Sequence, residues 1–243
     1  MRQLVACLLM MTIGLSLSAH ASDPVQDAIH KLDPTAKITS EERGPLPDLV
    51  TVIVNSQPLY ISTDGRYVIQ GQLYDLQRSV NVTAAHQADQ RVIALKAVPQ
   101  RDRITFTPPH VKYHITAFVD IECGYCHQMM NNLDGYLAQG IQIDFLAFPR
   151  AGLDTDSFRE AVAVWCAADP RWALRSAYTT KPAVTKPCKN PVAMELKLSE
   201  QLNIVGTPGV IADDGTVLGG FLSPTEMRKR LDEKQASAAT KSR

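Results

Sequence analysis

Two cysteines separated by two residues, Cys123-Gly124-Tyr125-Cys126, are the part of the chain best suited to chemistry. A cysteine thiolate is a strong nucleophile, and two cysteines this close form a disulfide with little backbone movement. The first would attack and the second would resolve, which makes Cys123 the candidate nucleophile and Cys126 its partner. The pattern favours thiol–disulfide exchange.

The elements expected around this motif place Cys123 at the start of a helix. Residues 113–119 are rich in β-branched and aromatic side chains, which is typical of a strand, and Asp120 ends the run. Apolar residues then recur at helical spacing, up to Gly140. They are Met129, Met130, Leu133 and Leu137. The free N–H groups and dipole of the first helical turn would stabilise a thiolate on Cys123.

Three other interpretations of the motif have to be weighed. Residues 123–127 match the Cys-x-x-Cys-His pattern of haem attachment, but a preceding strand argues against the mostly helical domain expected there. The pair would also supply half of a zinc site, yet no second pair follows at suitable spacing. An inert disulfide is disfavoured because so short a loop closes little chain entropy.

Cys166 and Cys188 form a second group with a different expected role. Cys166 lies beside Trp165 in an apolar helical stretch at 157–168, and Cys188 lies in a proline-rich loop. A bridge between them would pin that loop to the helix and stabilise the fold by about 3 kcal/mol in the chain-entropy model. Two buried, unreactive thiols are the alternative.

Thr207-Pro208 enters a predicted strand, where a proline is unusual because it cannot donate to the sheet. A cis bond here would expose the Thr207 backbone beside the cysteines for pairing with an extended substrate. Sequence physics alone does not choose cis over trans at this position.

The first 21 residues have the composition of an export signal. Arg2 is followed by the apolar stretch 4–17 and by the cleavage pattern Ala19-His20-Ala21. Cys7 would leave with the signal, so four cysteines stay in an exported chain, and an even set predicts two bridges. The 25 basic and 25 acidic residues balance, which gives no electrostatic footprint for nucleic acid.

The segment that follows the signal reads as a small α+β unit up to residue 86. We expect a helix at 24–32 capped by Asp23, strands at 49–54 and 59–62 around a turn at 55–58, and a strand at 67–71 after the turn Asp64-Gly65. Such a meander has little core and two exposed edges. We therefore expect it to pair with a second copy of itself.

A helical connector and a larger unit complete the chain. Residues 84–98 lack Gly and Pro and predict an unbroken helix that holds two domains apart, with an ordinary surface helix as the alternative. Beyond it we expect a strand at 141–148 parallel to 113–119, a helix ending near residue 202, a hairpin at 209–218, a closing helix from Pro224 capped by Ser223, and a frayed polar tail from Lys234.

The order of strand, Cys-x-x-Cys, helix and later Thr-Pro resembles the thioredoxin fold. Over nearly the whole mature chain it resembles the DsbC-type periplasmic disulfide isomerases of bacteria. The segments that carry this resemblance are 61–71 with Tyr74-Asp75, 123–127, 146–150, 165–167, 205–208 and 215–218. Such a spread is far more specific than the cysteine motif alone.

The resemblance implies a mixed α+β and α/β architecture. It has a signal peptide at 1–21, a cystatin-like dimerisation domain at 22–86, a linker helix at 87–102, and a thioredoxin-like catalytic domain with a helical insertion at 103–243. It also implies a V-shaped homodimer around an uncharged cleft, a cis Thr207-Pro208 bond that contacts substrate, and a structural Cys166–Cys188 bridge. A DsbD-type membrane reductase would keep Cys123 and Cys126 reduced, and neither a cofactor nor a metal is expected.

Four residues beside the cysteines are expected to tune the site: Glu122, Gly124, Tyr125 and His127. Glu122 departs from the threonine expected from the family pattern, and its carboxylate should oppose thiolate formation and raise the pKa of Cys123. The favoured activity is isomerisation and reduction of wrong disulfides in misfolded or unfolded exported proteins. A dithiol oxidase and a chaperone-like binder of unfolded chains are the alternatives.

Overall fold

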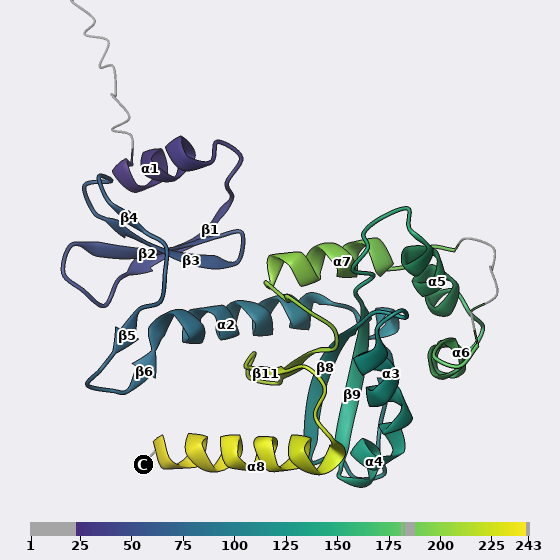
Figure 1. The fold of residues 1–243 in the computed structure, drawn as a ribbon. Coiled ribbons are helices and arrows are strands. Elements are labelled where there is room, and N and C mark those ends of the chain that lie inside the picture. Colours follow the sequence, from purple (N-terminus) through teal and green to yellow (C-terminus); the bar gives the residue numbers. More distant parts are fainter. Residues whose placement is uncertain (1–22, 181, 183–187, 242–243) are drawn as a thin grey trace, which may run out of the picture.

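The computed structural model describes residues 23–180, 182 and 188–241, arranged as a small N-terminal sheet domain and a larger C-terminal domain joined by a long helix (Figure 1). The predicted signal at 1–21 lies outside the described residues. Among the described helices, none combines the length and apolar character needed to cross a membrane.

The N-terminal domain is one helix packed on an antiparallel sheet. Helix α1 (Pro24–Leu32) begins at the predicted cap, where the Asp23 side chain accepts from the Val25 N–H. The strands are β1 (Ile38–Arg43), β2 (Leu49–Val54), β3 (Gln57–Ser62) and β4 (Val68–Ile69), in that order across the sheet. The predicted turn at 55–58 is shorter in the structure, because Asn55 and Ser56, both with positive φ, make a two-residue hairpin.

A short ribbon, β5 (Tyr74–Asp75) and β6 (Val80–Asn81), leads into helix α2 (Val82–Ala97), which Asn81 caps. The helix ends at Ala97, and a 3₁₀ turn (Gln100–Asp102) replaces the end of the predicted linker helix at 87–102. Buried Arg91 donates to the carbonyls of Leu202 and Gly215, and Gly215 comes so close that an added Cβ would meet the Ala88 carbonyl oxygen. Helix α2 is therefore docked on the C-terminal domain and is not a free spacer.

The C-terminal domain is built on a five-stranded sheet in the order β11-β10-β8-β9-β7. Its strands are β7 (Ile104–Phe106), β8 (Tyr113–Val119), β9 (Ile141–Ala147), β10 (Gly209–Ala212) and β11 (Val217–Gly219). Strands β8 and β9 are parallel, as predicted, and the other pairs are antiparallel. Side chains alternate between two faces: Ala117 and Phe145 join the larger core, whereas Phe118 and Leu146 join the core beneath α2.

In the described part of this domain, six helices pack around the sheet in addition to α2. They are α3 (Gly124–Asn131), α4 (Leu133–Ala138), α5 (Asp156–Trp165), α6 (Pro170–Ala177), α7 (Val192–Gln201) and α8 (Pro224–Lys241). The single helix predicted after Cys126 is interrupted at Asn132, and α6 was not predicted. The expectation of a frayed tail from Lys234 is wrong, because α8 stays helical to Lys241 and Lys234 forms an ion pair with Asp214.

Candidate active site

The two cysteines of the motif lie where the parallel strand β8 gives way to α3. Cys123 is the N-cap of α3, with extended backbone angles, and Cys126 lies within the first turn. Both thiols are free and buried, with 5% of Cys123 and 1% of Cys126 exposed. The N–H groups of the first turn therefore converge on Cys123, as the sequence predicted.

The predicted Thr207-Pro208 segment lies against the first cysteine, although it is 84 residues further along the chain. The bond between these residues is cis, and the Cys123 thiol donates to the Thr207 carbonyl oxygen over 3.1 Å. Residues 203–209 with Val217, Gly219 and Gly220 line a groove of about 250 Å³ beside this contact. An extended chain held in this groove would lie next to the Cys123 sulfur.

The two thiols have opposite acidities. Burial by itself raises the pKa of Cys123, but the polar groups of Thr207, Cys126 and Tyr125 around the sulfur outweigh it, so the pKa lies below its ordinary value. Burial dominates at Cys126 and, with the neighbouring Cys123 charge, raises the pKa of that thiol far above its ordinary value. Cys123 therefore ionises more readily than an ordinary cysteine, whereas Cys126 stays protonated.

A buried carboxylate, missed by the sequence analysis, organises the loop between β8 and α3. Asp120 accepts hydrogen bonds from the Ser157 hydroxyl at 2.7 Å and from the Glu122 N–H at 2.9 Å. It also accepts from the N–H and the guanidinium of Arg150, both at 3.0 Å. These hydrogen bonds outweigh the effect of burial and keep the pKa of Asp120 below its ordinary value. No short motif signals this cluster, because its side-chain partners, Arg150 and Ser157, are 30 and 37 residues away.

The four predicted tuning residues occupy different positions around the thiols. The Glu122 side chain is exposed, and only its N–H joins the Asp120 cluster. A Cβ added to Gly124 would meet nothing within 4 Å, so sterics do not require a glycine there. Tyr125 is 62% exposed beside the thiols, whereas the His127 ring turns inward, 5.6 Å from the ring of Tyr178.

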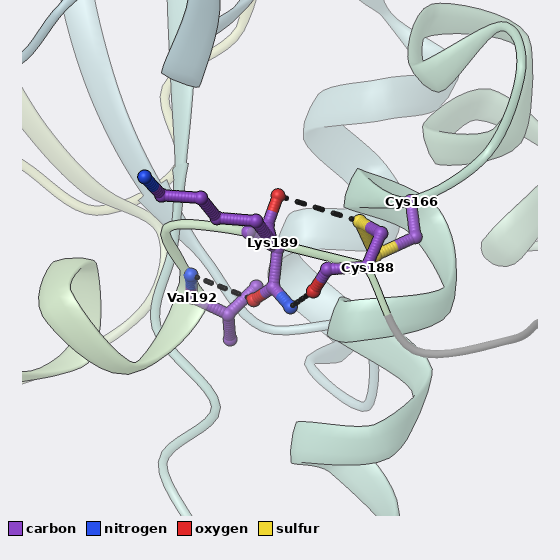
Figure 2. The surroundings of a disulfide bond; sticks show 5 residues. Cys166, Cys188, Lys189 and Val192 are labelled. Atoms are coloured by element: carbon purple, nitrogen blue, oxygen red, sulfur yellow. Dashed lines mark hydrogen bonds between the residues drawn. A yellow bond between two sulfur atoms is a disulfide. The ribbon is translucent and has the colours of Figure 1, made fainter.

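The second cysteine pair is bonded. Cys166 at the end of α5 and Cys188 form a disulfide, with their Cα atoms 5.7 Å apart, which confirms the predicted pairing (Figure 2). The Asn190 side chain donates to the Cys188 carbonyl and accepts from the Val192 N–H at the start of α7. The bridge thereby ties the end of α5 to the start of α7.

Comparisons with known proteins agree with this arrangement. Residues 16–84 match the disulfide bond isomerase protein N-terminal domain, and residues 99–235 match a thioredoxin-like domain. The chain is 36% identical to the thiol:disulfide interchange protein DsbC of Escherichia coli K12, over 92% of this chain and 93% of the relative. It is 32% identical to that of Dickeya dadantii, over 98% of both.

A disulfide interchange protein from Neisseria gonorrhoeae is among the solved structures similar to this chain, with a TM-score of 0.49, 23% identity and coverage of 55% of this chain and 97% of that one. The family assignment rests on the relatives found by sequence, because their similarity extends through both domains at above 30% identity. The chain belongs to the DsbC family of thiol:disulfide interchange proteins.

Proposed function

We propose that this protein is a disulfide isomerase and reductase that acts on misfolded exported proteins through a mixed disulfide with Cys123. The observation that carries the proposal is the free dithiol at the start of α3, with Cys123 against the cis Thr207-Pro208 bond and Cys126 buried behind it. The pKa values of the two thiols are shifted in opposite directions. The lowered pKa of Cys123 increases the fraction of its thiolate, which is the attacking species. A protonated Cys126 leaves substrate attached long enough to rearrange.

The catalytic cycle begins with one thiol–disulfide exchange and then has two possible outcomes. The Cys123 thiolate attacks one sulfur of a substrate disulfide, the substrate S–S bond breaks, and its second sulfur leaves as a thiolate. If a substrate thiolate then attacks the substrate sulfur of the mixed disulfide, Cys123 is released and the substrate has rearranged. If Cys126 loses its proton and attacks the Cys123 sulfur, the substrate leaves reduced and an enzyme disulfide forms.

That second outcome requires an external reductant to restore the dithiol. We assign this role to a DsbD-type membrane reductase and place the protein in the periplasm, where the export signal expected at 1–21 would send it. Thr207 and Pro208 would hold the substrate backbone in the adjoining groove. No nucleic acid takes part.

The N-terminal domain, proposed to span residues 22–86, suits a role in forming a homodimer. Strand β4 lies at the edge of its sheet and pairs on one side only, which leaves backbone groups open to a second copy. Large apolar side chains are exposed on and near it: Tyr67, Ile69, Tyr74 and Leu76. Two copies joined here would present two catalytic domains, proposed at 103–243, to one substrate.

Replacement of each cysteine tests this assignment. Cys123→Ala should abolish recovery of a scrambled multi-disulfide protein, while Cys126→Ala should still rearrange it but fail to release reduced substrate. Recovery that persists in Cys123→Ala would overturn the proposal. Thiol trapping in the periplasm separates the alternatives, because a mostly oxidised Cys123–Cys126 pair would indicate an oxidase.

We assign a structural role to the Cys166–Cys188 bridge. Cys166→Ser with Cys188→Ser should lower the free energy of unfolding by about 3 kcal/mol, as a loop of this length predicts, and leave the activity of the folded protein intact. Urea denaturation followed by the refolding assay on the folded variant measures both effects. Loss of activity without loss of stability would contradict the assignment.

A further inference from the structure

Tyr178, which follows helix α6, lies directly behind the catalytic dithiol. It comes from the helical segment inserted between β9 and β10, far from the cysteine motif in sequence. Only 6% of the residue is exposed, and it belongs to the same apolar cluster as Cys123 and Cys126. Its ring lies against His127, the residue after Cys126, with the ring planes inclined by 37°. The insertion thus closes the inner side of the site with one large aromatic residue.

The Tyr178 hydroxyl contacts the backbone of the loop that leads from β8 into the cysteine motif. It donates to the Asp120 carbonyl oxygen at 3.4 Å, and the same carbonyl accepts the Cys123 N–H at 3.1 Å. A hydrogen bond from the Asp120 backbone also reaches the Cys126 sulfur. Tyr178 is therefore anchored to Asp120, whose backbone contacts both thiol-bearing residues.

The side chain stays neutral at this position. Burial raises the pKa of Tyr178 well above its ordinary value, and the charges of Cys126, Asp120 and Cys123 raise it further. The neutral phenol therefore places no charge beside Cys126. The other titratable or charged groups around Cys126 are Cys123, Asp120, Arg150 and His127.

We propose that Tyr178 is a positioning residue that shields Cys126 from water and so sets how long a substrate stays bound to Cys123. This inference rests on the proposed function. Release of reduced substrate requires the Cys126 proton to pass to water and its thiolate to form a bond with the Cys123 sulfur. The Cys123–substrate bond then breaks, and the substrate sulfur leaves with the electron pair. A longer delay before this step favours rearrangement over reduction.

Tyr178→Ala tests the proposal by opening a path for water to Cys126. Each unit by which the pKa of Cys126 falls would raise its thiolate fraction about tenfold, and the accompanying loss of nucleophilicity reduces the gain in rate to about threefold. The measurement is a stopped-flow release of a peptide thiol from the mixed disulfide, across pH, together with the ratio of rearranged to reduced scrambled protein. We expect faster release and a lower ratio.

Leu174→Ala is the matched control, because Leu174 is fully buried on α6 in the same cluster. It should destabilise the domain comparably without changing the release rate or its pH profile. In a Cys126→Ala background Tyr178→Ala should have no effect on release, since no resolving thiol is present. If Tyr178→Ala does not fold, Tyr178→Leu leaves a smaller gap and should shift release in the same direction.

One result would overturn the role of Tyr178, and a different result would overturn the isomerase function on which that role rests. A folded Tyr178 variant with the release rate and product ratio of the unchanged protein, or with those of Leu174→Ala, overturns the role of Tyr178. Absence of any rearrangement by the unchanged protein, with reduction intact, overturns the proposed isomerase function instead.

Discussion

Two regions along strand β8 each hold a buried carboxylate paired with an arginine, yet only one of them, the catalytic end, lies beside the cysteines. In the other, which we call the inert end, Arg103 and His114 contact Asp144 of β9 at 2.8 Å and 3.0 Å. Asp144 lies opposite Thr116 in the sheet register. At the catalytic end, Asp120 pairs with Arg150 beside the cysteines. Both carboxylates and their three basic partners lie within the C-terminal domain.

The difference lies in how the charges are matched. In the His114–Asp144–Arg103 cluster opposite charges face one another: the carboxylates of Asp144 and Asp213 raise the pKa of His114 to about 9, and the partners of Asp144 outweigh its burial and lower its pKa to about 2. At the catalytic end the pKa values of the two neighbouring thiols are shifted in opposite directions, that of Cys123 downward and that of Cys126 upward. Shifted pKa values therefore indicate reactivity only where adjacent groups are left in different protonation states.

The largest effect is expected at the inert end, when the Asp144 carboxylate is replaced by a neutral amide. Asp144→Asn leaves Arg103 and His114 without their shared partner, and loss of one member of a buried pair costs about 3 to 5 kcal/mol. Urea denaturation should show this loss, while the folded variant keeps its thiolate titration and refolding activity. A change in Cys123 acidity of the folded variant would show that the two ends are coupled.

A second test uses the pH dependence of stability at the same end. The folded pKa of His114, about 9, lies above its ordinary value of 6.5. The stabilisation is complete below about pH 6.5 and is lost as the pH rises through about 9, with an upper limit of roughly 3 kcal/mol. The stability difference between the unchanged protein and His114→Gln should therefore shrink between pH 6 and pH 10. A constant difference would contradict the assignment.

At the catalytic end, replacement of Arg150 should change the pKa of Cys123 more clearly than it changes the free energy of unfolding. The charges of Cys123 and Cys126 contribute to the raised pKa of Arg150, after its hydrogen bond with Asp120, and by reciprocity Arg150 stabilises the thiolates. In Arg150→Met the absorbance of the Cys123 thiolate should appear at higher pH. Arg66→Met, in the N-terminal domain, provides the control. An unchanged titration would mean that the charge of Arg150 is fully screened.

Much of this fold was accessible from local sequence patterns. Strand β8 and the Asp23 cap follow from side-chain type alone, and the cysteines and Thr207-Pro208 form a motif that recurs with the fold. Helix α6 was missed because Asp169-Pro170 is typical of a loop. In the structure Asp169 caps this helix and Pro170 occupies its first turn.

The remainder depends on contacts that sequence spacing does not reveal. The docking of α2 rests on Arg91 reaching carbonyls more than 100 residues away, and the extended α8 is held by ion pairs to Lys112 and Asp214. The role proposed for Tyr178 is of the same kind, because a tyrosine at the end of an unpredicted helix carries no signal of a nearby thiol. Tertiary packing decided each of these cases.

The smallest expected effect concerns Glu122, the residue before the nucleophile. Its carboxylate should still oppose the Cys123 thiolate, but its side chain is exposed, so water and salt screen the interaction. Glu122→Thr should therefore lower the pKa of Cys123 slightly at low ionic strength and by less in high salt. Glu42→Thr removes the same charge from β1 of the other domain and should leave the titration unchanged. Identical Cys123 titrations for Glu122→Thr and the unchanged protein in low salt would rule out this tuning role, because screening is then weakest.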